Sequence, residues 1–218
     1  LSVLTEPDYF QGSPEILKPI RHGLPDACLL RKDFMIDPYQ IYQSKILGAD
    51  TILLIASALT LDEAYDLGAL ANDLGMEVLL EIHDETELDY ISRYTDMVGV
   101  NNRNLKTFVT DVSTSYSLAD MIPSDKVKVS ESGLSNPETV KELRKAGFRG
   151  FLMGERFMKE DIPGEALAVF IDKLNPDLYG DFYIKYDSSL TKNFKNNPFI
   201  EQFNQHVEKA LRLAIGKV

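Results

Sequence analysis

Four side chains that could transfer protons or bind a polar substrate stand at the ends of short apolar runs. They are Lys32, Glu81, Asn101 and Glu131. Runs of Val, Ile and Leu that are apolar on both parities are typical of parallel strands buried on both faces. The carboxyl ends of parallel strands lie at one edge of a sheet, where α/β folds keep their chemistry. The spacing therefore predicts a shared site containing a lysine, two carboxylates and an amide.

The runs that must position these residues alternate with longer amphipathic segments. This order predicts repeated βα units with right-handed crossovers, as in a (β/α)₈ TIM barrel. A closed barrel of this kind needs eight strands, and seven are recognised before Leu174. The seven expected strands are Leu1–Leu4, Ala27–Leu30, Thr51–Ile55, Glu77–Leu80, Met97–Val100, Lys126–Ser130 and Gly150–Met153.

Start and stop signals support the same division. Helix starts are expected at Ser13-Pro14, Asp37-Pro38, Thr60 and Asn136-Pro137, because each offers an N-cap side chain. The acidic stretch from Asp84 to Asp89 is expected to open a further helix. Helix ends are expected before Gly48, Gly75 and Gly147.

Composition narrows the functional classes. The 218-residue chain is 44% hydrophobic and 26% charged, which indicates a globular protein. The net charge of −11 argues against a general nucleic-acid binder, because phosphate backbones are bound by Lys and Arg. Cys28 is the single cysteine, which fits a reducing cytoplasm, and its apolar run predicts a core position. No apolar stretch approaches the roughly 20 residues of a membrane span.

Residues 175–218 could supply the missing strand. Asp181–Asp187 is expected to form a strand, and Phe199–Leu213 an amphipathic helix. The chain also starts inside a strand-like run, which suggests a fragment, a processed chain or a rearranged barrel. One interpretation places Phe182–Tyr186 between the first and last recognised strands, so that deletion of residues 175–218 would unfold or aggregate the protein. The other interpretation is an appended segment that docks on the outside.

Several motifs resemble indole-3-glycerol phosphate synthase. They include Leu30-Arg31-Lys32-Asp33-Phe34, Gly99-Val100-Asn101-Asn102-Arg103-Asn104, Ser130-Glu131-Ser132-Gly133-Leu134 and Phe151-Leu152-Met153-Gly154-Glu155. The resemblance covers residues 1–174, which would be βα units 2–8 of the family's (β/α)₈ barrel. It implies closure of the indole ring of 1-(2-carboxyphenylamino)-1-deoxyribulose 5-phosphate, with loss of CO₂ and water, in tryptophan biosynthesis.

The resemblance also implies roles for individual residues. Lys32 matches the family's general acid, and burial is expected to lower the pKa of this lysine toward the working range. Glu81 matches the acid or base of the dehydration step. Asn101 and Glu131 are expected to position the substrate, with Arg103 either as a loop partner or as a structural ion-pair residue. Phe10 and Phe34 are expected to pack against the aromatic ring of the substrate.

Two glycine-bearing loops are expected to bind the substrate's phosphate. Ser132-Gly133 and Gly154-Glu155 follow the last two recognised strands, and the loops at this place in a barrel commonly bind phosphate. Glycine lets the backbone N–H groups approach an anion closely. Glu155 suits this site only if its carboxylate faces away from the anion.

The chain also departs from the family. No first strand with Glu-x-Lys precedes Leu1, and Tyr183-Ile184-Lys185 imitates that strand only loosely. Lys185 is therefore a candidate catalytic residue whose position decides between two functions, an active synthase and an inactive truncated, rearranged or fused scaffold. A phosphoribosylanthranilate isomerase is a weaker alternative, because it would need a catalytic Cys and Cys28 comes too early on its strand.

The remaining expectations concern partners. The absence of metal-ligand spacing and of nucleotide-binding glycine motifs predicts neither a metal nor a cofactor. The expected partner is a small phosphorylated substrate, with no nucleic acid and no membrane, for a cytoplasmic monomer. His83 lies two residues beyond Glu81 and is expected to be an ordinary loop residue.

Overall fold

The computed structural model describes residues 1–104 and 107–174, in which the strands form one parallel sheet in chain order. The strands are β1 (Ser2–Leu4), β2 (Leu30–Lys32), β3 (Thr51–Ile55), β4 (Glu77–Ile82), β5 (Met97–Asn101), β6 (Val127–Glu131) and β7 (Phe148–Leu152). The α-helices are α1 (Leu17–Gly23), α2 (Pro38–Leu47), α3 (Leu61–Asp73), α4 (Ser113–Leu118), α5 (Pro137–Lys145), α6 (Glu155–Met158) and α7 (Pro163–Lys173). Short 3₁₀ helices are η1 (Pro14–Ile16), η2 (Ala56–Ala58) and η3 (Glu85–Tyr90).

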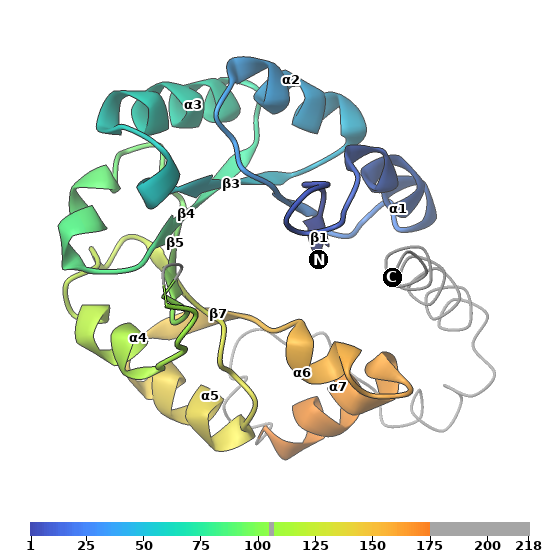
Figure 1. Ribbon diagram of the computed structural model, residues 1–218, viewed down its shortest axis with the longest axis vertical. Helices are drawn as coiled ribbons and strands as arrows, with labels where there is room; N and C mark the ends of the chain where they lie inside the picture. Colours follow the sequence, from blue (N-terminus) through green and yellow to red (C-terminus); the bar gives the residue numbers. More distant parts are fainter. Residues whose placement is uncertain (105–106, 175–218) are drawn as a thin grey trace. The chain divides into compact units, whose positions relative to one another are not determined.

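The chain divides into two compact units, Leu1–Arg156 and Phe157–Val218. All seven strands belong to the first unit, where they follow the inner side of an arc with α1 to α5 outside it (Figure 1). In the described part of the second unit, the rings of Phe157 and Phe170 meet edge to face with their centroids 5.4 Å apart. The alternation of parallel strands and helices confirms the predicted TIM-barrel class. The proposed eighth strand in residues 175–218 lies outside the described residues.

The inner and outer faces of the sheet have separate cores. Leu53 and Ile55 of β3 belong to an inner cluster, whereas Ile52 and Leu54 belong to the cluster that packs against the helices. The inner cluster joins Leu30 of β2, Leu79 of β4 and Val129 of β6, although β2 and β6 are not neighbours in the sheet. Side chains from such distant strands can meet only if the sheet curls toward its inner face. The described strands are therefore part of a curled barrel wall.

Most of the predicted helix signals are confirmed. Asp37 and Thr60 cap α2 and α3, and each forms a reciprocal capping box. Ser13 precedes η1 in an extended conformation but makes no side-chain capping bond. The acidic stretch after Asp84 forms η3 and is therefore a 3₁₀ helix. Gly48, Gly75 and Gly147 all have positive φ angles, as expected where helices end.

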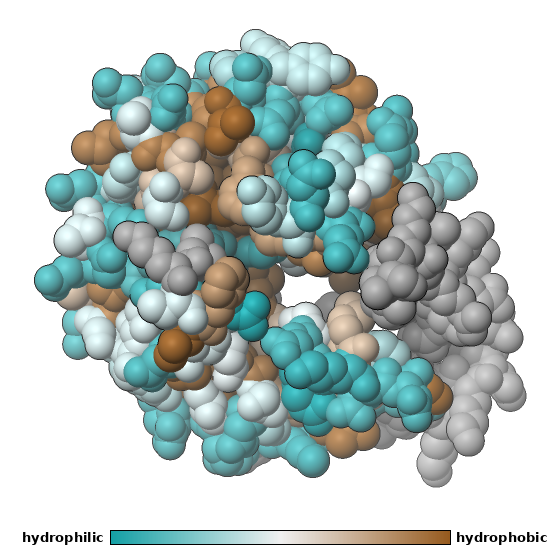
Figure 2. All heavy atoms as spheres, viewed as in Figure 1, coloured by the Kyte–Doolittle hydropathy of each residue, from teal (hydrophilic) through white to brown (hydrophobic). Residues whose placement is uncertain are grey.

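The surface corrects one prediction. Cys28 is exposed and is not a core residue, because β2 begins two residues later at Leu30 and the preceding segment lies outside the sheet. Hydrophilic residues cover much of the visible periphery, where hydrophobic side chains appear in small groups (Figure 2). Within the described part of the chain, no helix is long and apolar enough to cross a membrane.

Candidate active site at the strand ends

The parity of the strands directs the predicted catalytic side chains inward. Successive side chains of a strand alternate between the two faces of the sheet, so residues two apart share a face. Lys32, Glu81 and Glu131 each stand two residues after the inner-core residues Leu30, Leu79 and Val129. Each therefore faces the interior of the curl at the carboxyl end of its strand. We call these three residues the charged cluster.

The structure brings the charged cluster together. Lys32 Nζ lies 3.2 Å from Glu81 Oε2 and 3.0 Å from Glu131 Oε2. The side chains of both glutamates are 3% exposed, and that of Lys32 is 19% exposed. One ammonium thus bridges two carboxylates, in agreement with the rule that buried charges are paired with opposite charges. The three partners come from β2, β4 and β6, so the cluster exists only when the sheet curls.

Asn101 joins the cluster from the end of β5. Its Nδ2 donates a hydrogen bond of 2.8 Å to Glu81 Oε1. Its Oδ1 accepts a hydrogen bond of 3.0 Å from the backbone N–H of Arg103. Both ends of the amide are held, which fixes which atom faces Glu81. The structure therefore brings together all four residues that the strand-end pattern placed in one site.

A glycine makes room for Glu131. An ideal Cβ on Gly99 would lie 2.1 Å from Glu131 Oε1, far inside van der Waals contact. A side chain at position 99 of β5 would therefore displace the carboxylate from its place beside Lys32. This Oε1 atom is buried and has no hydrogen-bond partner within the described residues. An orphaned buried oxygen is costly unless it is protonated or meets a ligand.

The charges correct the expected pKa shift of Lys32. Burial lowers the pKa of this lysine, as predicted, but the negative charges of Glu131 and Glu81 outweigh burial and raise it above its ordinary value. Lys32 is therefore an ammonium at neutral pH. It gives up its proton only when a stronger base forms beside it, such as a carbonyl oxygen that gains negative charge as a bond forms.

The two carboxylates have opposite shifts. Burial raises the pKa of Glu131 to about 7, and the nearby charge of Glu81 adds to this effect, while Lys32 opposes it. Burial also disfavours ionised Glu81, but its contact with His83, the charge of Lys32 and the hydrogen bond from Asn101 together lower its pKa to about 2. Paired carboxylates that titrate far apart are suited to acid and base roles. At neutral pH, Glu81 is a base and Glu131 is poised between its two forms.

Replacement of Glu131 should change how stability depends on pH. A carboxyl whose pKa rises on folding stabilises the fold below its unfolded pKa and loses that contribution as pH rises through the folded pKa. Glu131→Gln has no proton to lose. We therefore expect the unfolding free energy of the wild type, relative to Glu131→Gln, to fall by about 3 kcal/mol between pH 4 and pH 8, from about 1.4 kcal/mol per pKa unit. Urea unfolding at a series of pH values measures this difference, and a flat difference would contradict the shift.

Two predicted aromatic residues, from the segments after β1 and β2, stack on each other. The rings of Phe10 and Phe34 have centroids 5.3 Å apart and an interplanar angle of 19°. Tyr9 meets Phe34 edge to face at 5.7 Å. Phe34 also packs against the inner core. The pair thus offers a flat apolar surface, although Phe10 and Phe34 come from the loops after different strands.

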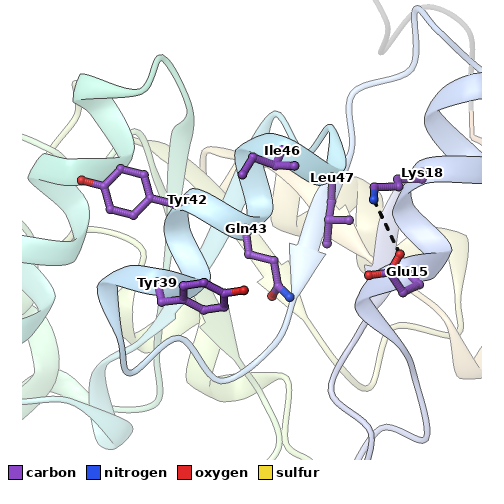
Figure 3. Close-up of a pocket in the computed structure, with 7 residues that line it drawn as sticks. All are labelled: Glu15, Lys18, Tyr39, Tyr42, Gln43, Ile46 and Leu47. Carbon is purple, nitrogen blue, oxygen red and sulfur yellow. Dashed lines mark ion pairs between the residues drawn. The ribbon is translucent and has the colours of Figure 1, made fainter.

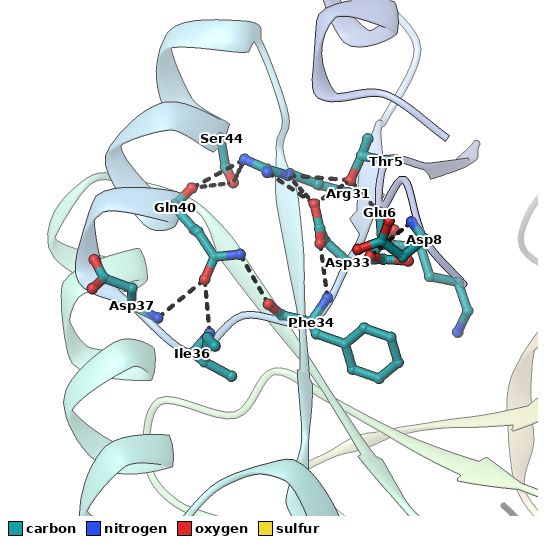
Figure 4. A network of polar contacts seen from close by, with 11 residues as sticks. Thr5, Glu6, Asp8, Arg31, Asp33, Phe34, Ile36, Asp37, Gln40 and Ser44 are labelled. Carbon is teal, nitrogen blue, oxygen red and sulfur yellow. Dashed lines mark hydrogen bonds and ion pairs between the residues drawn. The ribbon is translucent and has the colours of Figure 1, made fainter. Parts of the chain in front are cut away.

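Carboxylates hold the loops that carry these rings (Figure 4). Glu6 accepts hydrogen bonds from the backbone N–H groups of Asp8, Tyr9 and Phe10. Asp33 accepts one from the N–H of Phe34, at 2.9 Å, and one from the hydroxyl of Thr5, at 2.7 Å.

A buried arginine completes this network. The side chain of Arg31 is 2% exposed, and its Nη2 lies 2.9 Å from Asp33 Oδ2. On the other side it donates to the backbone oxygen of Gln40 and to the hydroxyl of Ser44, both in α2. The sequence alone suggested no role for Arg31. An arginine directly after an apolar run, with an aspartate two residues later, could have indicated a buried ion pair.

The loops expected to bind phosphate have a distinctive backbone. Ser132 and Gly133 both adopt positive φ angles, of 67° and 71°. A Cβ on Gly133 would lie 2.6 Å from Thr110 Cγ2, so glycine is required by both conformation and space. A Cβ on Gly154 would meet nothing within 4 Å. The side chain of Glu155 is 61% exposed and lies 3.1 Å from Arg103 Nη2.

One residue of the site was missed. His83 Nε2 lies 3.2 Å from Glu81 Oε1, so this histidine is a neighbour of the charged cluster. The sequence signal was its place one residue beyond β4, followed four residues later by Glu87. Lys185, by contrast, lies outside the described residues. Among the residues that the structure describes, no group of three or more His, Cys, Asp or Glu side chains could hold a metal ion.

The structure contains one cavity beside His83 and Asn101 and another between α1 and α2. A cavity of about 450 Å³ is lined by His83 after β4, by Asn101 at the end of β5, and by residues of the segment between β5 and α4 such as Asp111. Another, of about 210 Å³, lies between α1 and α2 and is lined by Lys18, Tyr39 and other residues (Figure 3). Neither cavity is lined by a member of the charged cluster, although the first is lined by its neighbours His83 and Asn101.

Comparison of the sequence with known proteins identifies the family. The family model of indole-3-glycerol phosphate synthase matches residues 1–168. The synthase of Bacteroides thetaiotaomicron is 56% identical over 173 residues, which are 78% of this chain and 65% of the relative. The synthase of Paracidovorax citrulli is 49% identical over 171 residues, which are 77% of this chain and 63% of the relative. The chain thus spans slightly less than two thirds of the length of these relatives.

Solved structures support the fold alone. KGPDC from Streptococcus mutans aligns with a TM-score of 0.60 and 16% identity, covering 79% of this chain and 84% of that one. The 3-keto-L-gulonate-6-phosphate decarboxylase of Vibrio cholerae aligns with a TM-score of 0.60 and 15% identity, covering 80% and 86%. Since the family model spans most of the sequence and curated relatives are about half identical, this chain belongs to the indole-3-glycerol phosphate synthase family.

Proposed function

We propose that the protein closes the indole ring of 1-(2-carboxyphenylamino)-1-deoxyribulose 5-phosphate, with loss of CO₂ and water. The observation that carries this proposal is the charged cluster, in which Lys32 lies within 3.2 Å of both Glu81 and Glu131. Family membership supplies the substrate, and the cluster supplies an acid and a base at one place.

Lys32 acts as the general acid. When the substrate's aromatic carbon attacks the ketone carbon, negative charge develops on the ketone oxygen, and the ammonium of Lys32 protonates it to a hydroxyl. The pKa of Lys32 is raised by its carboxylate neighbours, so the lysine is fully charged before the reaction begins. Departure of CO₂ from the same aromatic carbon then restores the ring.

Glu81 acts in the dehydration that follows. Its pKa of about 2 keeps it ionised, so it can accept the proton lost from the methylene carbon next to the nitrogen and pass it to the new hydroxyl, which then leaves as water. Asn101 holds Glu81 in place, and Glu131 positions the substrate's polar groups. Phe10 and Phe34 pack against the aromatic ring, and Lys185 is the candidate for a second lysine in the site. These roles are part of the proposal.

The direct test is an assay on the purified chain. Incubation with the carboxyphenylamino-deoxyribulose phosphate should produce indole fluorescence and an equal amount of CO₂. If neither product forms under conditions in which a full-length synthase is active, the chain is an inactive scaffold and the proposal is wrong.

We further infer that phosphate binds between Ser132-Gly133 and Gly154-Glu155. Two consecutive residues with positive φ turn the chain sharply after β6, glycine at 133 lets the backbone N–H groups approach an anion, and Arg103 draws the carboxylate of Glu155 to itself. Titration with inorganic phosphate, followed by amide NMR shifts, should move the signals of Gly133 and Gly154 but not that of Gly23 at the end of α1. No response at either loop would overturn this assignment.

The cellular setting follows from the same proposal. A small phosphorylated substrate is the expected partner, and the net charge of −11 argues against nucleic acid. We expect a monomer in the cytoplasm, for which size-exclusion chromatography with light scattering provides the measurement of oligomeric state.

A further inference from the structure

His83 stands between the charged cluster and an acidic residue of η3. It is the first residue after β4, and Asp84 caps η3 immediately behind it. The backbone N–H of His83 donates a hydrogen bond of 2.7 Å to Glu87 Oε2. The same oxygen lies 3.2 Å from His83 Nδ1. Glu87 thus holds both the backbone and the ring of His83, which leaves the other ring nitrogen directed elsewhere.

That nitrogen lies beside Glu81 at ion-pair distance, without forming a hydrogen bond to any described residue. His83 Nε2 lies 3.2 Å from Glu81 Oε1, the same oxygen that accepts from Asn101. The other oxygen, Oε2, faces Lys32. The side chains of His83 and Glu87 are 13% and 14% exposed, so water screens these contacts only partly. The carboxylate of Glu81 therefore has a lysine, an amide and an imidazole as neighbours.

We propose that His83 is a positioning residue, which in its imidazolium form, held by Glu87, keeps Glu81 ionised and correctly oriented for the dehydration step. This inference rests on the proposed function, because it concerns the base of that reaction. His83 itself touches no reacting atom. Its effect passes through Glu81, in the same way that a buried carboxylate orients a catalytic histidine in other enzymes.

The charge state of the imidazole agrees with the geometry. Burial lowers the pKa of His83, but its contacts with Glu81 and Glu87 outweigh burial and raise that pKa to about 9. Among the described residues, these two carboxylates are the charged groups that act on the imidazole. His83 is consequently a second cation beside Glu81 at neutral pH. Contact with His83 also lowers the pKa of Glu81 more than any other stabilising interaction does.

The coupling can be measured without turnover. The chain has three histidines, His22, His83 and His206, and their imidazole NMR signals can be titrated and assigned with a His83→Gln variant. We expect His83 to titrate well above the ordinary range of a histidine, with a pKa of about 9. Glu81→Gln, which removes one partner, should lower the titration midpoint of His83 by at least one pH unit. An unchanged midpoint in Glu81→Gln would overturn the inference.

Kinetics then test the positioning role. His83→Gln should lower kcat about 10-fold to 100-fold with KM within about threefold, since a misplaced catalytic group costs rate and not binding. The acidic limb of the pH profile of kcat should move upward, because Glu81 loses the cation that favours its ionised form. Glu87→Gln should reduce kcat in the wild type but not further in His83→Gln. His22→Gln is the matched control and should be indistinguishable from the wild type.

The outcomes separate this inference from the proposed function. A wild-type chain without synthase activity would overturn the proposed function and, with it, the catalytic meaning of the contact. An active wild type, combined with an unmoved acidic limb in His83→Gln, would overturn the inference alone. Additive losses in the Glu87→Gln and His83→Gln double variant would also overturn it, since Glu87 would then act independently of the histidine.

Discussion

Lys32→Ala is expected to lower kcat by a factor of about 10² to 10⁴, the usual range for loss of a general acid, while KM changes far less. The reason is that the proton of Lys32 is needed chiefly when charge develops on the ketone oxygen. Removal of the ammonium also leaves Glu81 and Glu131 without their shared cation. Glu131 can adapt by taking up a proton, since its pKa is already raised to about 7. The variant should therefore fold.

Two further variants separate proton transfer from charge. Lys32→Arg keeps a positive charge between the carboxylates but cannot lose its proton, so it should fold with wild-type stability and remain slow. Lys18→Ala removes an exposed lysine whose ion pair with Glu15 is 3.8 Å long, and it should be fully active. Steady-state kinetics on the three proteins gives the comparison. Near-normal kcat in Lys32→Ala would refute the acid role, and near-normal kcat in Lys32→Arg would reduce that role to electrostatics.

The sequence predicted the strands best where hydrophobicity alone decides their limits. The predicted and observed bounds of β3, Thr51–Ile55, coincide, because every residue of that run is buried. The second strand was predicted at Ala27–Leu30 and lies at Leu30–Lys32. The prediction ended the strand at Leu30 because the apolar run ends there and a charged residue follows. Arg31 and Lys32 nevertheless extend β2, because each finds buried partners on its own side of the sheet.

The membership of the site was predictable, whereas its electrostatics were not. Lys32, Glu81, Asn101 and Glu131 could be grouped because the ends of parallel strands share an edge. The sign of the pKa shift at Lys32 was wrong, since it depends on carboxylates 49 and 99 residues away in the chain. His83 was missed for the same reason. Its distance from Glu81 depends on how the chain turns after β4, and no local pattern specifies that turn.

Arg31→Met should destabilise the fold more than any other single change in the described network. The arginine is buried with Asp33, and removal of one partner of a buried ion pair leaves an uncompensated charge at a cost of about 3–5 kcal/mol. For a chain of this size, that loss corresponds to a fall in Tm of about 10 °C. The variant also loses the contacts between β2 and α2 that Ser44 and Gln40 provide.

The double variant Arg31→Met with Asp33→Asn distinguishes charge from packing. Asparagine keeps an acceptor for the N–H of Phe34 but carries no charge, so the double variant should recover part of the lost stability. Lys141→Met is the control, because its ion-pair partner Glu138 is 68% exposed and the pair should contribute less than about 1 kcal/mol. Thermal unfolding followed by circular dichroism measures all three. If the double variant is no more stable than Arg31→Met, the cost comes from lost packing and hydrogen bonds between β2 and α2. Partial recovery would show that the buried charge of Asp33, which also accepts from the N–H of Phe34, requires Arg31.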